Sequence, residues 1–266
     1  MVKKILSVLL CAAVLVFIYA PILLLVVYSF TTSNVIGKWE GNFSFELYAQ
    51  VFRSADIMQI LFKTVWLALA AAALSTVLGT AGAIGIFYSR RRAAKPLQAA
   101  SQIPVINAEI VTAISLALLF SAVFLYRTYF SLIVGHMVLC TPFVVLSVLP
   151  KLKQMDSNTY EAALDLGASP SQALFKVVVP QIFSGILSGF MLSITLSLDD
   201  YIVTAFTKPP MFDTISTYVY NAVKNGTNSS TPALRALSAL IFVVMIVILL
   251  VVNLRARKPS SKEAAK

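Results

Sequence analysis

Three acidic side chains lie inside long apolar stretches of this 266-residue chain. Glu109 stands in the stretch 103–126, and Asp199 and Asp200 come late in the stretch 181–206. An ionised carboxylate within hydrocarbon is costly, so an acid at such a position is first considered a functional group. The chemistry that these carboxylates offer is the pairing of a negative charge with a cation.

The stretch that contains both aspartates also carries hydroxyl groups at helical spacing. Thr195 precedes Asp199 by four residues, and Ser188 lies seven residues before Thr195, so the three share one helical face. At about 1.5 Å per residue, Glu109 is expected about 10 Å from one membrane face, whereas the aspartates are expected nearer the other. Carboxylates at two depths suit an elongated cation with several amines, and they repel anions. Glu109, Thr195, Asp199 and Asp200 are therefore the candidate substrate-binding residues.

A structural role for the same acids stays open. Asp199 and Asp200 could cap a helix end at the membrane interface, and Glu109 could hold neighbouring helices together. The sequence alone does not choose between these roles and cation binding.

The composition predicts the elements that must position these side chains. Hydrophobic residues make up 59% of the chain and charged residues 12%, which excludes an ordinary soluble globule. Six apolar segments each reach the roughly 20 residues that a helix needs to cross a hydrocarbon core of about 30 Å. Because lipid offers no hydrogen-bond partners to the backbone, and no segment alternates like a barrel strand, helices are expected. The sequence therefore predicts one all-α membrane domain over residues 1–266, with six transmembrane helices at about 5–30, 62–88, 103–126, 131–150, 181–206 and 233–254.

The basic residues predict how these helices are oriented. Of the 21 Lys and Arg residues, 14 lie at the two termini and in the connections 89–102 and 151–180. The positive-inside rule places both termini and these connections in the cytoplasm. The same clustering explains the net charge of +10 by topology and by contact with membrane lipids, so no nucleic-acid partner is expected. On the other side, the loop 31–61 is long enough to hold a short amphipathic helix that begins after Ser44.

A polar, helix-forming segment, 151–180, separates the fourth and fifth apolar stretches. Asn158 and Glu161 have the spacing of a capping box, and Gly167 stands where a helix would end in a left-handed residue. Ser169 is followed by a proline and then by a Gln three residues on, which indicates a second helix start. Pro180 ends that helix or begins the next span. The segment is predicted to be a helix–turn–helix elbow on the cytoplasmic side.

This elbow closely resembles the EAA loop of ABC importer permeases. The matching positions are Glu161, Ala162, Ala163, Gly167 and Pro180, while Val177 and Val179 replace the usual Ile and Leu. The resemblance implies a coupling helix that fits a cleft on a cytosolic ATPase. The alternative is an ordinary amphipathic surface hairpin.

Taken with the elbow, the segments 107–109, 197–200 and 43–48 are similar to the permease subunits of spermidine/putrescine ABC importers. This resemblance covers nearly the whole chain and implies alternating-access uptake of polyamines across a bacterial inner membrane. It implies as partners a homologous second permease subunit, two ATPase subunits and an extracytoplasmic polyamine-binding protein. It also implies that Glu109 and Asp199 or Asp200 contact the amines. The alternatives are a permease for another small solute, such as iron, an opine or thiamine, and a channel or assembly factor without an ATPase.

No catalytic or cofactor-binding motif accompanies these features. The chain has no G-x-x-x-x-G-K-[ST] phosphate-binding motif, so ATP hydrolysis is expected in a separate subunit. Cys11 and Cys140 lie in different apolar stretches and have no metal-ligand or disulfide spacing. A non-enzymatic membrane subunit without cofactor or metal is expected.

Overall fold

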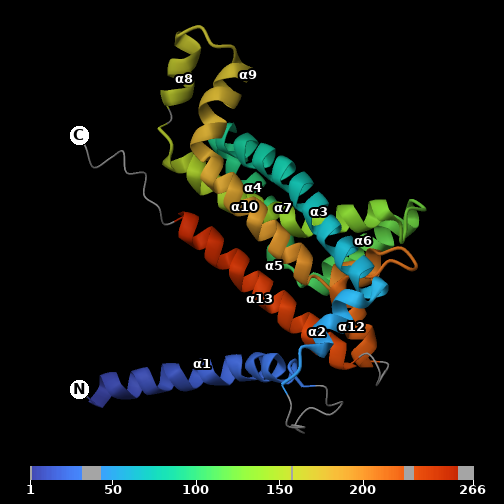
Figure 1. Cartoon of the computed structure of the whole chain (residues 1–266). Helices are drawn as coiled ribbons and strands as arrows, with labels where there is room; N and C mark the ends of the chain where they lie inside the picture. Colours follow the sequence, from blue (N-terminus) through green and yellow to red (C-terminus); the bar gives the residue numbers. More distant parts are fainter. Residues whose placement is uncertain (1, 32–42, 157, 225–230, 257–266) are drawn as a thin grey trace. The chain divides into compact units, whose positions relative to one another are not determined.

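The computed structural model describes residues 2–31, 43–156, 158–224 and 231–256 (Figure 1). Every regular element within these ranges is helical, which confirms the predicted all-α class. The chain divides into two compact units, one formed by residues 1–59 and 219–266 and the other by residues 60–218.

Within the described ranges, three helices lie wholly in the first unit. They are α1 (Val2–Tyr28), α2 (Glu46–Arg53) and α13 (Thr231–Ala256), and α13 contacts both of the others. Helix α2 lies in the predicted loop 31–61, of which residues 32–42 are outside the described ranges. The Glu46 N–H donates to Ser44 Oγ at 3.1 Å, although Phe45 rather than Ser44 occupies the residue before the helix.

The second unit contains the candidate site. Helix α7 (Tyr129–Gln154) is central to this unit, because α5, α6, α10 and α11 all pack against it. The other elements with residues in this unit are α3 (Ala55–Tyr88), α4 (Arg91–Ser101), α5 (Ile103–Ile106), α6 (Glu109–Ala122), α8 (Asn158–Asp165), α9 (Pro170–Ala173), the π-helix η1 (Leu174–Val178), α10 (Val179–Asp199), α11 (Ile202–Thr207) and α12 (Ile215–Lys224).

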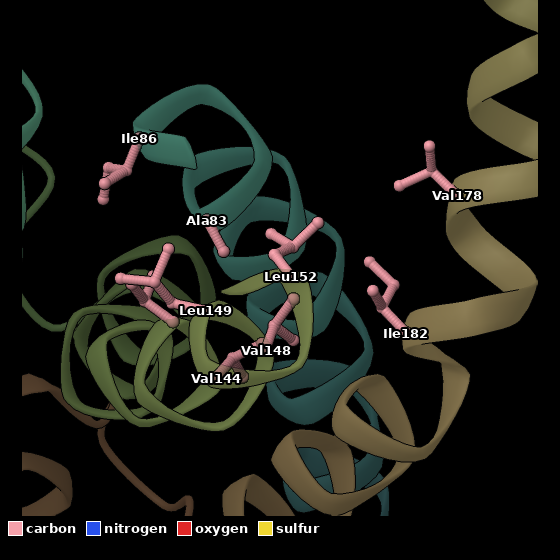
Figure 2. Packing of buried hydrophobic residues seen from close by; sticks show 9 residues of the cluster. Ala83, Ile86, Val144, Val148, Leu149, Leu152, Val178 and Ile182 are labelled. Carbon is pink, nitrogen blue, oxygen red and sulfur yellow. The ribbon is translucent and has the colours of Figure 1, made fainter. Parts of the chain in front are cut away.

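An aliphatic cluster on α7 forms the core of this unit. Val144, Val148 and Leu152 follow one another at intervals of four residues and are fully buried. Figure 2 shows them between α3, which contributes Ala83, and the segment that carries Val178. Because branched side chains at this spacing line one face of a helix, α7 presents a continuous apolar ridge to both neighbours.

Glycines let the neighbouring helices approach this ridge. A Cβ on Gly79 of α3 would lie 2.5 Å from Val144 Cβ, and one on Gly189 of α10 would lie 3.1 Å from Val144 Cα. Small residues at such positions allow close backbone approach between membrane helices. Three helices are thereby packed around one valine.

Three described helices are long and apolar enough to cross a membrane by themselves. They are Leu9–Tyr28 of α1, α3 and α7. Two further pairs reach the required length only when a sharp bend is included, and α13 holds a shorter apolar run, Ala233–Val244. The membrane character is therefore clear, whereas the count of six spans stays a prediction.

The expectation that the third and fifth apolar stretches are each one continuous helix is wrong. The third breaks between Arg92–Ile106 and Glu109–Ala122, whose axes differ by 101°. The fifth bends by 69° between Pro170–Gln181 and Phe183–Asp199, and it breaks again before α11. Non-helical backbone at such points is tolerated in membrane proteins where it lies against protein or lines a cavity.

Candidate substrate and coupling sites

The break in the third stretch places Glu109 at a helix start. Asn107 and Ala108 have extended backbone, and α6 begins at Glu109. Asn107 suits this position because its short polar side chain competes with helical hydrogen bonding, and here its Nδ2 group donates to Thr112 Oγ1 at 3.5 Å. A negative charge in the first turn is stabilised by the helix dipole. The depth counted along a straight helix therefore does not apply to Glu109.

The second break is organised by Asp200. Its side chain is buried, and Oδ1 accepts the Val203 N–H at 3.1 Å. Oδ2 accepts both the Thr204 N–H at 2.8 Å and the Thr204 hydroxyl at 2.6 Å. Asp200 thus satisfies backbone donors at the start of α11, so the helix-capping role that the sequence left open applies to this residue.

Asp199 and Thr195 are placed differently. Asp199 is exposed and ends α10, where the helix dipole disfavours a negative charge. Within the described ranges its carboxylate makes no hydrogen bond, so its charge is not explained by capping. The half-buried Thr195 hydroxyl donates to the Met191 carbonyl of its own helix at 3.0 Å.

The two helix breaks meet. Helix α11 packs against α6, and the Glu109 carboxyl group lies close to that of Asp200, with Asp199 within electrostatic range. Two carboxylates in contact repel each other unless a proton or a cation compensates one charge. The structure therefore brings the three predicted acids together at the junction of α6, α10 and α11, whereas Thr195 is not part of this contact.

A cavity of about 200 Å³ adjoins this junction. Glu109 is its acidic group, and Asn107 and Thr112 supply neutral polar groups. The remaining lining is apolar and comes from Pro104, Val105, Leu139, Phe143, Leu196 and Val203. Asp199, Asp200 and Thr195 are not among the lining residues. A carboxylate in an apolar wall can pair with an ammonium group while the wall accepts methylene groups.

A buried histidine lies behind this cavity, and the sequence reasoning left it out of the site. His136 of α7 is fully buried, and its two ring nitrogens contact Ser197 Oγ at 2.8 Å and Thr204 Oγ1 at 3.0 Å. Its Nε2 atom also lies 3.6 Å from Asp200 Oδ2. A signal was present in the sequence, because Ser197 and Thr204 stand three residues before and four residues after Asp200, a spacing that puts polar groups on one face of a continuous helix.

The first helix of the elbow ends as the sequence predicts. Gly167 has φ +86°, its N–H donates to the Leu164 carbonyl at 2.9 Å, and the Ala168 N–H donates to the Ala163 carbonyl at 3.0 Å. This pair of bonds is a Schellman motif, which satisfies carbonyls at the helix end. A Cβ at Gly167 would meet no atom within 4 Å, so only the backbone requires glycine there.

The second helix also begins as predicted, but the first does not. Ser169 Oγ accepts the Gln172 N–H at 3.3 Å while Gln172 Oε1 accepts the Ser169 N–H at 3.1 Å, which is a complete capping box. Asn158, expected as a cap, is instead the first residue of α8, and Asp156 Oδ1 accepts its N–H at 3.0 Å. A residue that begins the helix cannot also precede it, so the Asn158–Glu161 capping box is absent.

The elbow is anchored to the core yet projects from it (Figure 1). Val178 of η1 is buried in the aliphatic cluster, and the Tyr160 ring of α8 lies 5.3 Å from that of Tyr88. Glu161 is exposed, and the exposed fraction of Leu166 at the tip is 89%. An apolar tip on a polar elbow is the kind of group that fills a pocket on a partner.

The remaining matched positions continue this surface. Ala162 is exposed, Ala163 is half-buried, and Pro180 lies in the first turn of α10. The helical backbone continues from η1 into α10, so Pro180 removes a donor inside it, and the 69° bend between Pro170–Gln181 and Phe183–Asp199 follows directly. Pro180 thus lies where the second helix of the elbow passes into the next span, as the sequence predicts.

Long apolar helices and two sharply bent helix pairs characterise the chain, and its sequence matches a known family. Residues 77–257 match the family described as binding-protein-dependent transport system inner membrane component, which is more than half of the chain. The chain belongs to this family. The permease resemblance predicted from the elbow and the acids is thereby confirmed.

Relatives named PotC and PotI match this chain over most of its length. The spermidine/putrescine transport system permease protein PotC of Haemophilus influenzae is 31% identical over 242 residues, which are 91% of this chain and 93% of that protein. PotC of Escherichia coli K12 is 31% identical over 245 residues, with coverage of 92% and 91%. The putrescine transport system permease protein PotI of E. coli K12 is 32% identical over 232 residues, with coverage of 85% and 81%.

Solved structures share the fold. A chain of a bacterial alginate ABC transporter in complex with an alginate pentasaccharide-bound periplasmic protein has a TM-score of 0.68 at 20% identity and covers 96% of this permease and 94% of its own length. A chain of the MetNI methionine ABC transporter has a TM-score of 0.58 at 19% identity, with coverage of 77% and 98%.

Membership in the family defines the general role of the chain. It is a non-catalytic membrane permease that works with an ATPase, a substrate-binding protein and a second permease. The number of copies of each partner and the orientation of the termini stay predictions.

Proposed function

We propose that this permease moves polyamines, spermidine or putrescine, into the cell by alternating access. The observation that carries the proposal is the Glu109 carboxyl in the wall of an otherwise largely apolar cavity at the meeting point of two broken helices. The names of the PotC and PotI relatives, which specify spermidine and putrescine transport, support the same substrate class.

The chemistry of the cavity fits an alkyl ammonium ion. An ammonium group would pair with Glu109. Its positive charge would also reduce the repulsion between the Glu109 and Asp200 carboxylates. The methylene chain would then lie against apolar lining such as Leu139 and Leu196. The Phe143 ring could receive an ammonium group on its face, a contact that gains strength where water is excluded. An anion would meet only repulsion.

The four predicted substrate-binding residues then have different roles. Glu109 contacts the amine directly. Asp200 acts through its charge from behind Glu109, because its oxygens accept the hydrogen bonds at the start of α11. The exposed Asp199 attracts a second amine on its way to or from the cavity, and Thr195 lies along that path on the same helix.

Coupling to ATP hydrolysis is assigned to the elbow 151–180. Glu161, Ala162, Ala163, Gly167 and Pro180 would shape it for a cleft on the ATPase, with Leu166 as the apolar tip. The distribution of basic residues supports a cytoplasmic elbow and cytoplasmic termini. The complete importer would hold two permeases, two ATPases and one extracytoplasmic polyamine-binding protein.

Uptake by the complete transporter tests the substrate. The permease and its genetically neighbouring partners are reconstituted in proteoliposomes, and uptake of labelled putrescine, spermidine and thiamine is measured with ATP inside. We expect saturable uptake of a polyamine and none of thiamine. The proposal is refuted if the complex takes up thiamine alone, or if it hydrolyses ATP but takes up no polyamine.

A pair of variants then tests the role of Glu109. Glu109→Gln keeps the size of the side chain and removes its charge, so we expect the KM for polyamine to rise about tenfold or more, as for loss of one partner of a charge pair. The matched control is Glu46→Gln, the same change on the exposed surface of α2. Equal KM values in the two variants, at equal amounts in the membrane, would remove Glu109 from the substrate role.

A further inference from the structure

Both ring nitrogens of His136 are used to connect two helices across a break. Nδ1 lies 2.8 Å from Ser197 Oγ of α10, and Nε2 lies 3.0 Å from Thr204 Oγ1 of α11. The imidazole itself belongs to α7 and is fully buried. Helices α10 and α11 are separated by the residues 200–201, so the ring links the two sides of this break through a third helix.

With an ionised Asp200, the contacts fix the direction of the hydrogen bonds from His136 through Thr204 to Asp200. An ionised carboxylate only accepts, so the Thr204 hydroxyl must donate its one hydrogen to Asp200 Oδ2, at 2.6 Å. Thr204 Oγ1 can then only accept from His136, which places the proton on Nε2. Full burial favours the neutral ring, in which Nδ1 is the acceptor and the Ser197 hydroxyl donates to it. The imidazole is then held in one tautomer.

We propose that His136 is a positioning residue for polyamine binding, which orients Asp200 against Glu109 through Thr204. The inference rests on the proposed function and adds to it the group that holds the acidic pair. His136 does not touch the cavity, whose lining includes its helix neighbours Leu139 and Phe143 instead. Its effect reaches substrate through the carboxyl of Asp200.

The packing of α7 against α11 makes such control possible. A Cβ on Gly135 would lie 2.8 Å from Val203 Cγ1, so the Val203 side chain of α11 packs directly on the α7 backbone next to His136. Helix α11 has only six residues, and few hydrogen bonds of its own hold it in place. Its direction therefore depends on the side chains that tie it to α7 and α10.

Two amide substitutions separate the two bonds of the ring. In His136→Gln the amide N–H can reach the former position of Nε2 and still donate to Thr204, whereas in His136→Asn only the acceptor near Nδ1 is retained. In the complete transporter we expect His136→Asn to raise the KM for polyamine about tenfold with Vmax nearly unchanged, a factor that corresponds to about 1.4 kcal/mol. His136→Gln should keep the KM within about twofold of the parent.

A purely structural histidine would behave otherwise. Both variants would then lower either the amount of protein in the membrane or Vmax, and both would leave the KM for polyamine unchanged. That result would overturn the proposal. If His136→Asn does not accumulate, Thr204→Val replaces it, because it exchanges only the hydroxyl of a buried side chain for a methyl group. An unchanged KM in Thr204→Val would equally overturn the proposal.

The tautomer gives a readout that needs no polyamine. His136 is the one histidine of this chain. In ¹⁵N-histidine NMR, the signal that is present in the parent complex and absent from the His136→Gln complex therefore belongs to this ring. A proton on Nε2 and a bare Nδ1 are expected, and a proton on Nδ1 would refute the hydrogen-bond chain. Failure of polyamine uptake with the expected tautomer would instead refute the proposed substrate, so the two failures are distinguishable.

Discussion

Replacing Gly167 with valine should separate ATP hydrolysis from transport. Gly167 has φ +86°, and no atom lies within 4 Å of a Cβ placed there, so the cost comes from the backbone alone. A left-handed conformation costs an L-residue roughly 1–2 kcal/mol, and a β-branched residue is disfavoured further. One or two kcal/mol corresponds to a factor of about 5–30 in the population of the native turn. We expect uptake per hydrolysed ATP to fall by a similar factor.

The chain offers a matched control for this change. Gly85 of α3 also has no atom within 4 Å of its added Cβ, but its backbone is helical, so Gly85→Val carries no left-handed strain. Gly167→Asn is a second control, because asparagine tolerates the left-handed region. Uptake, ATPase rate and co-purification of the ATPase are measured for all three. The reasoning would be refuted if Gly167→Val kept the parental uptake per hydrolysed ATP. It would also be refuted if Gly85→Val lost as much uptake per hydrolysed ATP as Gly167→Val.

Three other predictions address packing, capping and charge. Gly79→Ala should destabilise the solubilised protein by about 1–3 kcal/mol, since its Cβ would overlap Val144, whereas Gly82→Ala, with its nearest contact at 3.8 Å, should be neutral in thermal unfolding. Ser169→Ala should cost about 1 kcal/mol of α9 stability, seen as faster amide exchange, and unchanged exchange would exclude the capping role. Asp199→Asn should raise the KM for polyamine less than Glu109→Gln does, because Asp199 lies outside the cavity; the reverse order in uptake assays would reassign the direct contact.

The sequence predicted the elements whose signals are local. Gly167 and the capping box of Ser169 were recognised because a left-handed helix end and a reciprocal side-chain cap depend on residues within one turn. The shift at Asn158 shows the limit of such signals, since Asp156 offers an equivalent oxygen two residues earlier.

The breaks at Asn107 and Asp200 could not be predicted from hydropathy. The residues on both sides are apolar enough to continue a span, and the backbone groups that a break exposes are satisfied by partners distant in sequence or by side chains such as Asp200. The sequence predicts Glu109 and the aspartates at different depths along straight helices. It does not predict that they lie close together. The contact between Glu109 and Asp200 exists because both helices start anew at the same place.

The five-residue π-helix η1 gives the elbow a further property. Helix α9, η1 and α10 form one uninterrupted backbone, and η1 is the wide turn between its two ends. Each α-helical residue turns the chain by about 100°. Deleting one residue from η1 would convert the wide turn into an ordinary α-helical one and leave the helices on both sides facing nearly as before, because a π turn holds one residue more than an α turn. This segment can therefore absorb one residue more or less, while the direction of the elbow follows from the 69° bend between Pro170–Gln181 and Phe183–Asp199.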